Sequence, residues 1–205
     1  MIAVFVAGAM LAPAAHAEEK TPTFTAGEGL ARETGSQVEQ QQFTLATGTF
    51  KCKEANLTDK AAVTGMMLIM EPSYSGCTLG GVTATVSMNE CKYTFEPTST
   101  TEPDKYMGRM GVICPVGGSI KISNGACTVT IEEQLNLEAV EFENNTAAEP
   151  KKDEKWTTNI KSLVYMQTGT CSGGTGIFAS GGMMGSETVK GESAVGEPVD
   201  LWIGD

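Results

Sequence analysis

Acidic side chains are the first group in this sequence that could do chemistry, because two carboxylates can hydrolyse a glycosidic bond without any histidine. The candidates gather in one stretch: Glu132, Glu133, Glu138, Glu141, Glu143, Asp153 and Glu154. On a strand, Glu141 and Glu143 would flank Phe142 and point to the opposite face. The pattern therefore favours a solvated acidic face over a catalytic pair.

Methionine and aromatic side chains offer two weaker chemistries. Met107 and Met110 have a spacing that could present two thioethers to Cu(I), although methionine is also a common core residue. A sugar-stacking platform would need exposed rings, and only 6% of the residues are aromatic. The candidate rings are those of Tyr74, Tyr106, Trp156, Tyr165 and Trp202. Both the methionine and the aromatic side chains could equally well be packed in the hydrophobic core.

The scarcity of histidine is the strongest restriction on enzymatic function. The chain has a single histidine, His16, and it lies in a segment that we expect to be removed. The remaining chain cannot form a Ser-His or Cys-His nucleophile pair, and it cannot bind zinc through imidazole. We therefore predict that the protein is not an enzyme and that it has no catalytic, cofactor-binding or metal-binding residues.

The N-terminal residues 1–17 predict a secretory signal peptide. An apolar run at 2–11 is followed by Ala15-His16-Ala17, the small-x-small pattern of a cleavage site. No lysine or arginine precedes the apolar run, so the true start of the signal peptide stays open. We expect a protein that is secreted or held on the exterior of the cell envelope.

Hydropathy and charge restrict the partners. No run approaches the ~20 apolar residues of a membrane-spanning helix. The formal net charge is −11, and the chain has no basic patch. Such a surface repels nucleic acid. We expect no membrane span and no nucleic-acid partner.

The cysteines predict what holds the fold together. An even number of cysteines in an exported chain indicates three disulfide bonds, formed from Cys52, Cys77, Cys91, Cys114, Cys127 and Cys171. Cysteines next to strands alternate along the chain with cysteines that precede Gly-Gly. A hairpin that returns from Phe95 through Met110 would bring Cys91 to Cys114. This geometry favours Cys91–Cys114 and, by analogy, Cys52–Cys77 and Cys127–Cys171, among the fifteen pairings that six cysteines allow.

The elements that must position these residues are strands. Alternating apolar residues, frequent threonine and 24 glycines are typical of an all-β domain with many turns. The chain from Glu132 to Val140 is the best candidate for a helix, although alternation fits it at least as well. The predicted fold is an antiparallel sandwich, stapled by disulfides, with Greek-key-like connections.

We expect three regions along the chain. The signal peptide is followed by a polar, loosely ordered arm at 18–42 with one strand near Phe24. A single β domain then occupies 43–205. Within it, the apolar run 66–70 predicts a strand buried on both faces, and the polar stretch 144–155 predicts a surface loop that could divide two sub-lobes.

The cysteine contexts resemble a known group of proteins. The relevant stretches are Gly-Thr-Phe-Lys-Cys52, Tyr74-Ser-Gly-Cys77, Asn89-Glu-Cys91-Lys-Tyr-Thr-Phe95, Cys114-Pro-Val-Gly-Gly118 and Cys127-Thr-Val-Thr-Ile-Glu-Glu-Gln134. They look like uncharacterised secreted β-rich proteins of soil actinobacteria, over about Phe43 to Cys171. The resemblance implies export and a β-rich fold, and it carries no functional residues.

These observations predict a secreted, non-enzymatic β domain that binds an unknown ligand in the envelope or outside the cell. Two alternatives stay open: a polysaccharide hydrolase that uses paired carboxylates, and a passive structural protein of the cell envelope. A cleft with two carboxyls and flanking aromatic rings would favour the hydrolase. An exposed apolar patch would favour the binding protein.

Overall fold

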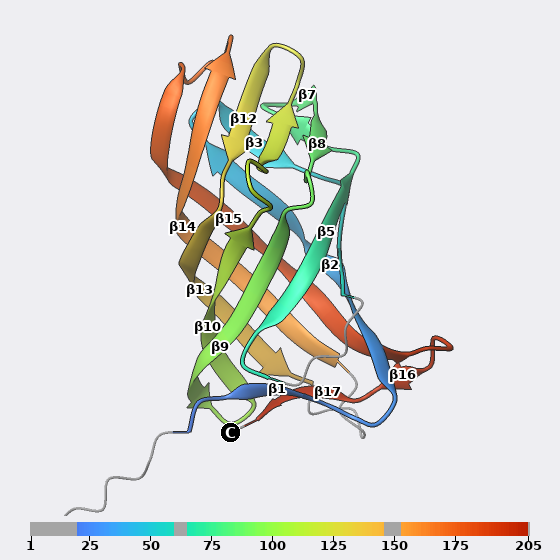
Figure 1. Cartoon of the computed structure of the whole chain (residues 1–205). Helices are drawn as coiled ribbons and strands as arrows, with labels where there is room; N and C mark the ends of the chain where they lie inside the picture. Colours follow the sequence, from blue (N-terminus) through green and yellow to red (C-terminus); the bar gives the residue numbers. More distant parts are fainter. Residues whose placement is uncertain (1–19, 60–64, 146–152, 205) are drawn as a thin grey trace, which may run out of the picture.

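A computed structural model describes residues 20–59, 65–145 and 153–204 (Figure 1). The regular elements in these stretches are all strands, and their pairs run antiparallel. The predicted all-β, antiparallel fold is therefore confirmed. The predicted signal peptide and His16 lie outside the described residues.

Three long strands run through the length of the molecule (Figure 1). They are β2 (Leu30–Leu45), β14 (Asp153–Gly169) and β15 (Gly176–Ser193). β15 lies in the middle, because it pairs with β14 along one edge and with β2 along the other. The two outer strands each have different partners along their two halves.

Around the lower halves of these strands the sheet closes on itself. The strands that complete it are β4 (Glu54–Thr58), β5 (Leu68–Ser75), β9 (Lys92–Glu102), β10 (Lys105–Ile113) and β13 (Gln134–Asn144). The order is β2-β4-β5-β9-β10-β13-β14-β15, and β15 pairs again with β2. Opposite sides of this closed ring pack against each other across the core, as the two layers of the predicted sandwich would. Unlike the layers of a sandwich, the two sides belong to one continuous hydrogen-bonded sheet.

The upper half is built from short strands. They are β3 (Gly48–Lys51), β6 (Thr78–Leu79), β7 (Val82–Thr83), β8 (Thr85–Ser87), β11 (Ile120–Ser123) and β12 (Cys127–Ile131). β3 pairs with β2, and β12 pairs with β14. β10 and β13 are neighbours although β11 and β12 separate them in sequence, which is a Greek-key-like connection.

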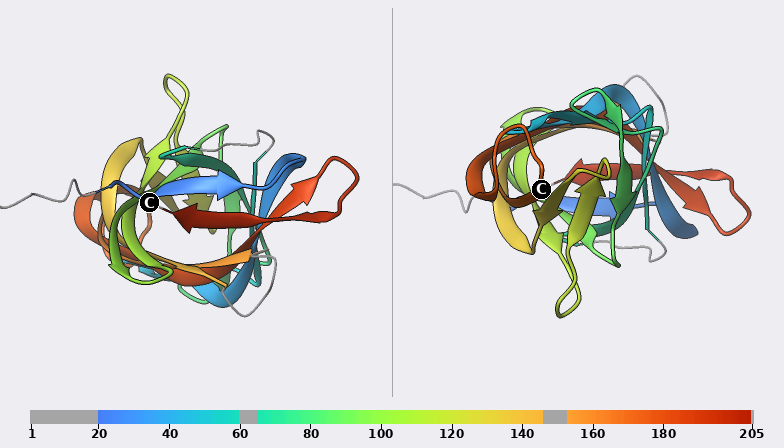
Figure 2. Two further views of the ribbon diagram at one scale, coloured as in Figure 1. Left: turned by 90° about the horizontal axis from the view of Figure 1, so that it is seen from below. Right: turned by 90° about the horizontal axis from the view of Figure 1, so that it is seen from above.

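A two-stranded ribbon crosses the lower end of the ring (Figure 2). It consists of β1 (Thr23–Ala26) and β17 (Leu201–Gly204), and the short β16 (Pro198–Val199) leads into it. Its apolar side chains Phe24, Leu201 and Ile203 are buried. The ribbon therefore seals the core at this end.

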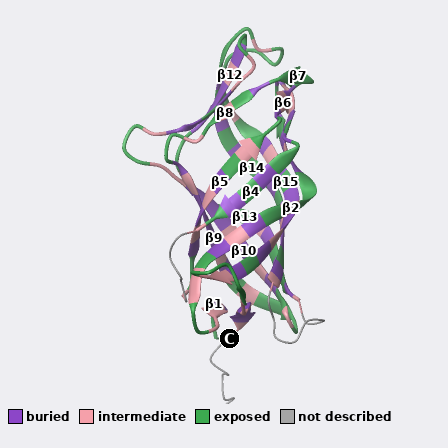
Figure 3. Ribbon diagram, turned by 90° about the vertical axis from the view of Figure 1, so that its right-hand side faces the viewer, coloured by how far each residue is buried: buried purple, intermediate pink, exposed green. Residues whose placement is uncertain are grey.

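Aromatic rings fill the core above the ribbon. Trp156 lies with its ring centroid 4.6 Å from that of Phe95, 5.4 Å from that of Phe142 and 5.7 Å from that of Phe24. On β10, Gly108 makes room for this cluster, because a Cβ there would lie 2.6 Å from the Phe142 ring. Buried residues alternate with exposed ones along the strands (Figure 3).

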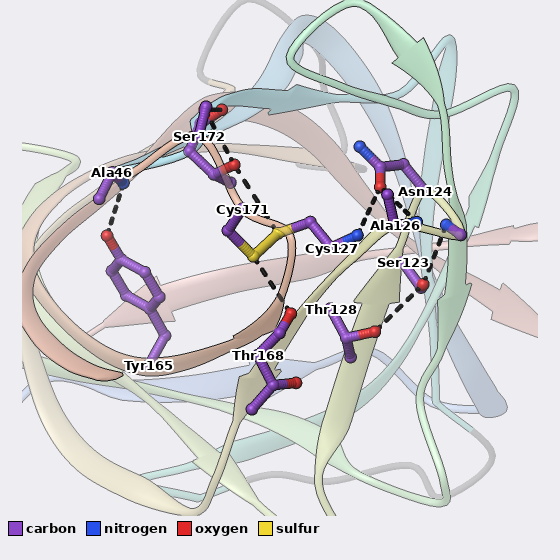
Figure 4. The surroundings of a disulfide bond; sticks show 12 residues. Ala46, Ser123, Asn124, Ala126, Cys127, Thr128, Tyr165, Thr168, Cys171 and Ser172 are labelled. Carbon is purple, nitrogen blue, oxygen red and sulfur yellow. Dashed lines mark hydrogen bonds between the residues drawn. A yellow bond between two sulfur atoms is a disulfide. The ribbon is translucent and has the colours of Figure 1, made fainter. Parts of the chain in front are cut away.

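The three disulfide bonds join the predicted pairs: Cys52–Cys77, Cys91–Cys114 and Cys127–Cys171. The predicted hairpin is also confirmed, since Met110 lies opposite Phe95 and Ile113 opposite Lys92. Figure 4 shows the Cys127–Cys171 bond, which ties β12 to the turn between β14 and β15. The Asn124 Oδ1 atom accepts a hydrogen bond from the Cys127 N–H at 2.9 Å and fixes the start of β12.

The polar segment predicted to be a loosely ordered arm is instead mostly strand. In the described part of 18–42, β1 contains Phe24, and β2 begins at Leu30 and pairs with β15 and β4. Within this segment, the interior positions of β2 carry Glu33, Gly35 and Gln41. Because these residues are not apolar, the usual alternation of a half-buried strand is hidden.

Three smaller expectations also change. The run 66–70 is not a strand buried on both faces, because β5 begins at Leu68 and the side chains of Met66 and Met67 are 60% and 43% exposed. The helix candidate falls largely on strand β13. The segment 144–155 joins paired strands, since Asn144 lies opposite Glu154, so it connects two strands of one ring rather than two lobes.

Asn144 holds the ribbon in place, and its removal should destabilise the fold. Its Nδ2 donates to the Ile203 carbonyl at 2.8 Å, and its Oδ1 accepts from the Ile203 N–H at 2.8 Å. We expect Asn144→Ala to lower the free energy of unfolding by about 2 to 3 kcal/mol, because buried backbone groups lose a partner. Urea unfolding measures this, with the exposed Asn159→Ala as control; equal effects of the two variants would contradict it.

Candidate functional site

The acidic residues singled out in the sequence do not converge on one another as a catalytic pair would. Glu132, Glu133, Glu138, Glu141 and Glu143 are exposed on β13 or just before it. As predicted, Glu141 and Glu143 lie on the outer face of their strand.

Cationic residues lie beside several of these carboxylates. Glu143 has Lys105 opposite it on β10 and Lys155 on β14. Glu138 lies opposite Arg109, which donates two hydrogen bonds to Glu96 at 2.8 and 2.9 Å. This arrangement is that of a solvated, charge-paired sheet face.

Three carboxyls of the described residues are buried inside the ring: that of Glu154, which the sequence singled out, and those of Glu33 and Glu187. The pKa of Glu154 is raised to about 8: burial is the main cause, a 2.6 Å hydrogen bond from the Trp156 indole opposes the shift, and the charge of the nearby Glu33 adds to it. Burial also raises the pKa of Glu187 to about 7, opposed by a hydrogen bond from the Gln41 amide. None of the three residues is exposed to solvent at all. A substrate therefore has no access to any of these carboxyls.

The methionine and aromatic candidates are spread through the fold. Met110 is fully buried, whereas Met107 lies on a half-exposed position of the same strand. Tyr106, Trp156 and Tyr165 are buried in the core, so they do not form an exposed platform. The described residues contain no group of three or more histidine, cysteine, aspartate or glutamate side chains that could hold a metal ion.

A hollow lies along the Cys91–Cys114 disulfide. Its volume is about 640 Å³, within the range of small-molecule sites. We call it the Cys91–Cys114 groove. It is lined by Glu71, Pro72, Met88, Glu90, Cys91, Lys92, Ile113, Cys114 and Pro115.

The sequence places these residues together because β9 and β10 form a hairpin. Lys92 and Ile113 are opposite each other at the open end of that hairpin, and the disulfide bond closes it one residue further on. β5 lies on the other edge of β9 and adds Glu71 and Pro72. The groove therefore combines an apolar floor with a charged rim.

The turn before β9 holds the groove's most unusual backbone. Asn89 and Glu90 have φ of 47° and 64°, and the Cys91 N–H donates to the Met88 carbonyl at 2.8 Å. Two positive φ values in a row are typical of a tight turn in which glycine is preferred at the second position. Asn89 is fixed by hydrogen bonds to Ser87 and Ser119. Glu90 occupies a strained position, and such strain is often found at functional sites.

The charges on the rim leave it negative. The Lys92 Nζ lies 2.8 Å from the Glu71 Oε1, and this hydrogen bond raises the pKa of Lys92, to which the charge of Glu90 also contributes. Glu90 is exposed, and its carboxylate accepts no hydrogen bond from any residue that the structure describes. One carboxylate therefore stays available for a positively charged group.

Sequence reasoning missed this site. Its floor consists of common core residues, and Glu71 is distant in sequence from Glu90 and Lys92. The dipeptide Asn89-Glu90 before a cysteine is a weak turn signal, because glutamate gives no hint of a positive φ.

No protein-family model, curated protein or solved structure matches this chain. Among the described residues, no helix is long and apolar enough to cross a membrane.

Proposed function

We propose that the protein is an extracellular, non-catalytic binding domain whose ligand lies in the Cys91–Cys114 groove and carries a positive charge on an apolar body. The single observation that carries this proposal is the combination of an apolar floor with the available carboxylate of Glu90. Three disulfide bonds support an oxidising compartment.

Chemistry at the groove supports binding over catalysis. The two carboxyls with raised pKa values, which a hydrolase would use as acids, are buried elsewhere in the core. The groove lining contains no aromatic ring on which a sugar could stack. The polysaccharide hydrolase is therefore the weaker proposal.

Three probes with the same body test the charge preference: 4-phenylbutylammonium, 4-phenylbutanol and 4-phenylbutyrate. Met88 lines the groove, so its methyl resonance should report binding by NMR in protein labelled at methionine methyls. We expect the ammonium compound to bind several-fold more tightly than the alcohol, and the carboxylate to bind least. Equal binding of all three, or no shift at Met88, would count against the groove.

Substitution of Glu90 should separate binding from stability. Glu90→Gly relieves a positive φ and should raise the free energy of unfolding by about 0.5 to 1 kcal/mol, while it weakens binding of the ammonium probe about 2- to 5-fold. Glu90→Gln should weaken binding similarly without the gain in stability. Glu39→Gln, at an exposed position elsewhere, is the control. If both Glu90 variants bind as well as the wild type, Glu90 has no role in recognition.

A further inference from the structure

A second hollow lies where β12 and β13 separate. Both strands pair with β14, but along different stretches: Thr130 of β12 lies opposite Met166, whereas Val140 of β13 lies opposite Thr158. The fork between them holds a hollow of about 170 Å³. It is lined by Thr130, Glu132, Glu133, Gln134, Val164, Tyr165, Met166 and Ile177.

One amide side chain bridges the fork between β12 and β13. The Gln134 Nε2 donates to the Val164 carbonyl at 2.9 Å, and its Oε1 accepts from the Val164 N–H at 2.9 Å. Gln134 therefore satisfies the backbone of β14 where no strand pairs with it. Because this backbone needs no further partner, the neighbouring side chains can remain exposed around an open hollow.

Those side chains are apolar. Val164 is 42% exposed, Met166 is 36% exposed and Ile177 is 77% exposed. Met166 and Ile177 lie directly opposite each other on β14 and β15, and Val164 is two residues from Met166 on the same face. Exposed apolar side chains that gather around a hollow mark an interaction surface more often than isolated ones do.

The rim of the hollow is acidic. Glu132 and Glu133 form the connection between β12 and β13, and both are exposed. Glu133 also accepts a hydrogen bond from the Cys114 N–H at 3.3 Å, so Glu132 is the carboxylate more available to a partner. An acidic rim on a chain of net charge −11 disfavours a second copy of the same chain as the occupant.

We propose that this fork surface, made of Val164, Met166, Ile177, Glu132 and Glu133, docks a basic segment of a partner protein. The partner inserts one aliphatic side chain into the hollow, and its flanking lysine or arginine residues face Glu132. A volume of 170 Å³ is below the ~300 Å³ at which small-molecule sites begin, so one side chain is the better fit. The surface is separate from the Cys91–Cys114 groove and does not depend on the function proposed for it.

Defined peptides test this surface. Three nine-residue peptides share Gly-Ser flanks and differ at the centre: lysine–leucine–lysine, glutamate–leucine–glutamate and lysine–serine–lysine. The Met166 methyl resonance reports binding directly, because this side chain lines the hollow. We expect the first peptide to shift it in a saturable way and to bind at least five-fold more tightly than the other two.

Two variants make the test specific. Ile177→Ser should weaken binding of the lysine–leucine–lysine peptide at least five-fold, and Glu132→Gln about 2- to 5-fold. Val195→Ser, at another highly exposed valine, should change nothing. The proposal is overturned if the acidic peptide binds equally well, if no peptide shifts Met166 at millimolar concentration, or if sedimentation shows a dimer that Ile177→Ser abolishes. The last outcome would identify a second copy as the occupant.

Discussion

Reduction of the disulfide bonds is expected to unfold this protein at 37 °C without denaturant. The bonds link residues separated by 25, 23 and 44 positions in the sequence. Chain-entropy arguments assign loops of this size about 3 to 4 kcal/mol each. Because a domain has a net stability of only ~5 to 15 kcal/mol, the loss of all three bonds removes most or all of it.

The arrangement of the short strands makes the upper half especially dependent on these bonds. β6 and β7 contain two residues each, and β8 contains three. Cys52–Cys77 joins the end of β3 to the start of β6, and Cys127–Cys171 joins β12 to the β14–β15 turn. Strands this short gain little from their own pairing, so the crosslinks define where they lie.

Circular dichroism with and without reductant measures the effect, and urea unfolding measures single bonds. The double variant with Cys127→Ser and Cys171→Ser opens the longest loop and should lose about 4 kcal/mol. The variant with Cys91→Ser and Cys114→Ser opens the shortest loop and should lose less. A reduced protein that keeps its native melting temperature would show that packing alone holds the fold.

The Cys91–Cys114 bond could be predicted because it follows from local geometry, and the other two pairs were reached by analogy with it. The two strands of the β9–β10 hairpin are consecutive in sequence, and their alternating apolar residues identify them as strands. Pairing of these two strands brings Cys91 next to Cys114. The same reasoning holds for the all-β class, because apolar alternation in most strands is a local property. Neither inference needs knowledge of distant contacts.

The interior of the ring could not be predicted in the same way. β2, β14 and β15 place Glu33, Gln41, Glu154, Gln167 and Glu187 in buried positions. A buried carboxyl or amide is indistinguishable from an exposed one in a single sequence, since its partners lie on other strands. The polar composition of 18–42 therefore predicts an arm instead of a strand, and the sequence gives no signal that Glu187 is buried.

The two hollows also depend on distant contacts. The Cys91–Cys114 groove needs β5 beside β9, and the fork surface needs β12 and β13 to share β14. Single residues give only partial signals. In the sequence, nothing distinguishes Gln134 from other polar residues, although its amide takes the place of a strand partner for the Val164 backbone.

The buried carboxyls lead to the second large prediction, that stability falls as the pH rises. The carboxyls of Glu154 and Glu187 ionise near pH 4.5 in an unfolded chain, but burial raises their pKa in the folded protein to about 8 and about 7. Between pH 4.5 and these raised pKa values, the folded chain therefore binds more protons than the unfolded chain. Each pH unit then lowers the free energy of unfolding by about 1.4 kcal/mol per group.

The direction of the effect follows from this proton balance. The contribution of both groups is fully present below pH 4.5 and is lost as the pH passes about 7 for Glu187 and about 8 for Glu154. We expect a total loss of about 3 to 5 kcal/mol for each group between pH 4.5 and pH 9. Burial also raises the pKa values of Tyr74 and Tyr93, whose hydroxyls are 2.9 Å apart, so these phenols stay protonated over the same range.

Two isosteric variants test whether Glu187 and Glu154 cause the loss of stability at alkaline pH. Glu187→Gln keeps an acceptor for the Gln41 amide and Glu154→Gln keeps one for the Trp156 indole, but neither can ionise. At pH 9 each variant should therefore be more stable than the wild type by about 3 kcal/mol or more, whereas near pH 4.5 the difference should shrink to about 1 kcal/mol. The exposed Glu141→Gln serves as the control. If urea unfolding gives parallel pH profiles for the wild type and both variants, the buried carboxyls do not govern the alkaline loss. Profiles that converge toward pH 4.5 and diverge toward pH 9 would show that the folded core keeps these two protons at neutral pH, and that the protein is most stable in mildly acidic surroundings.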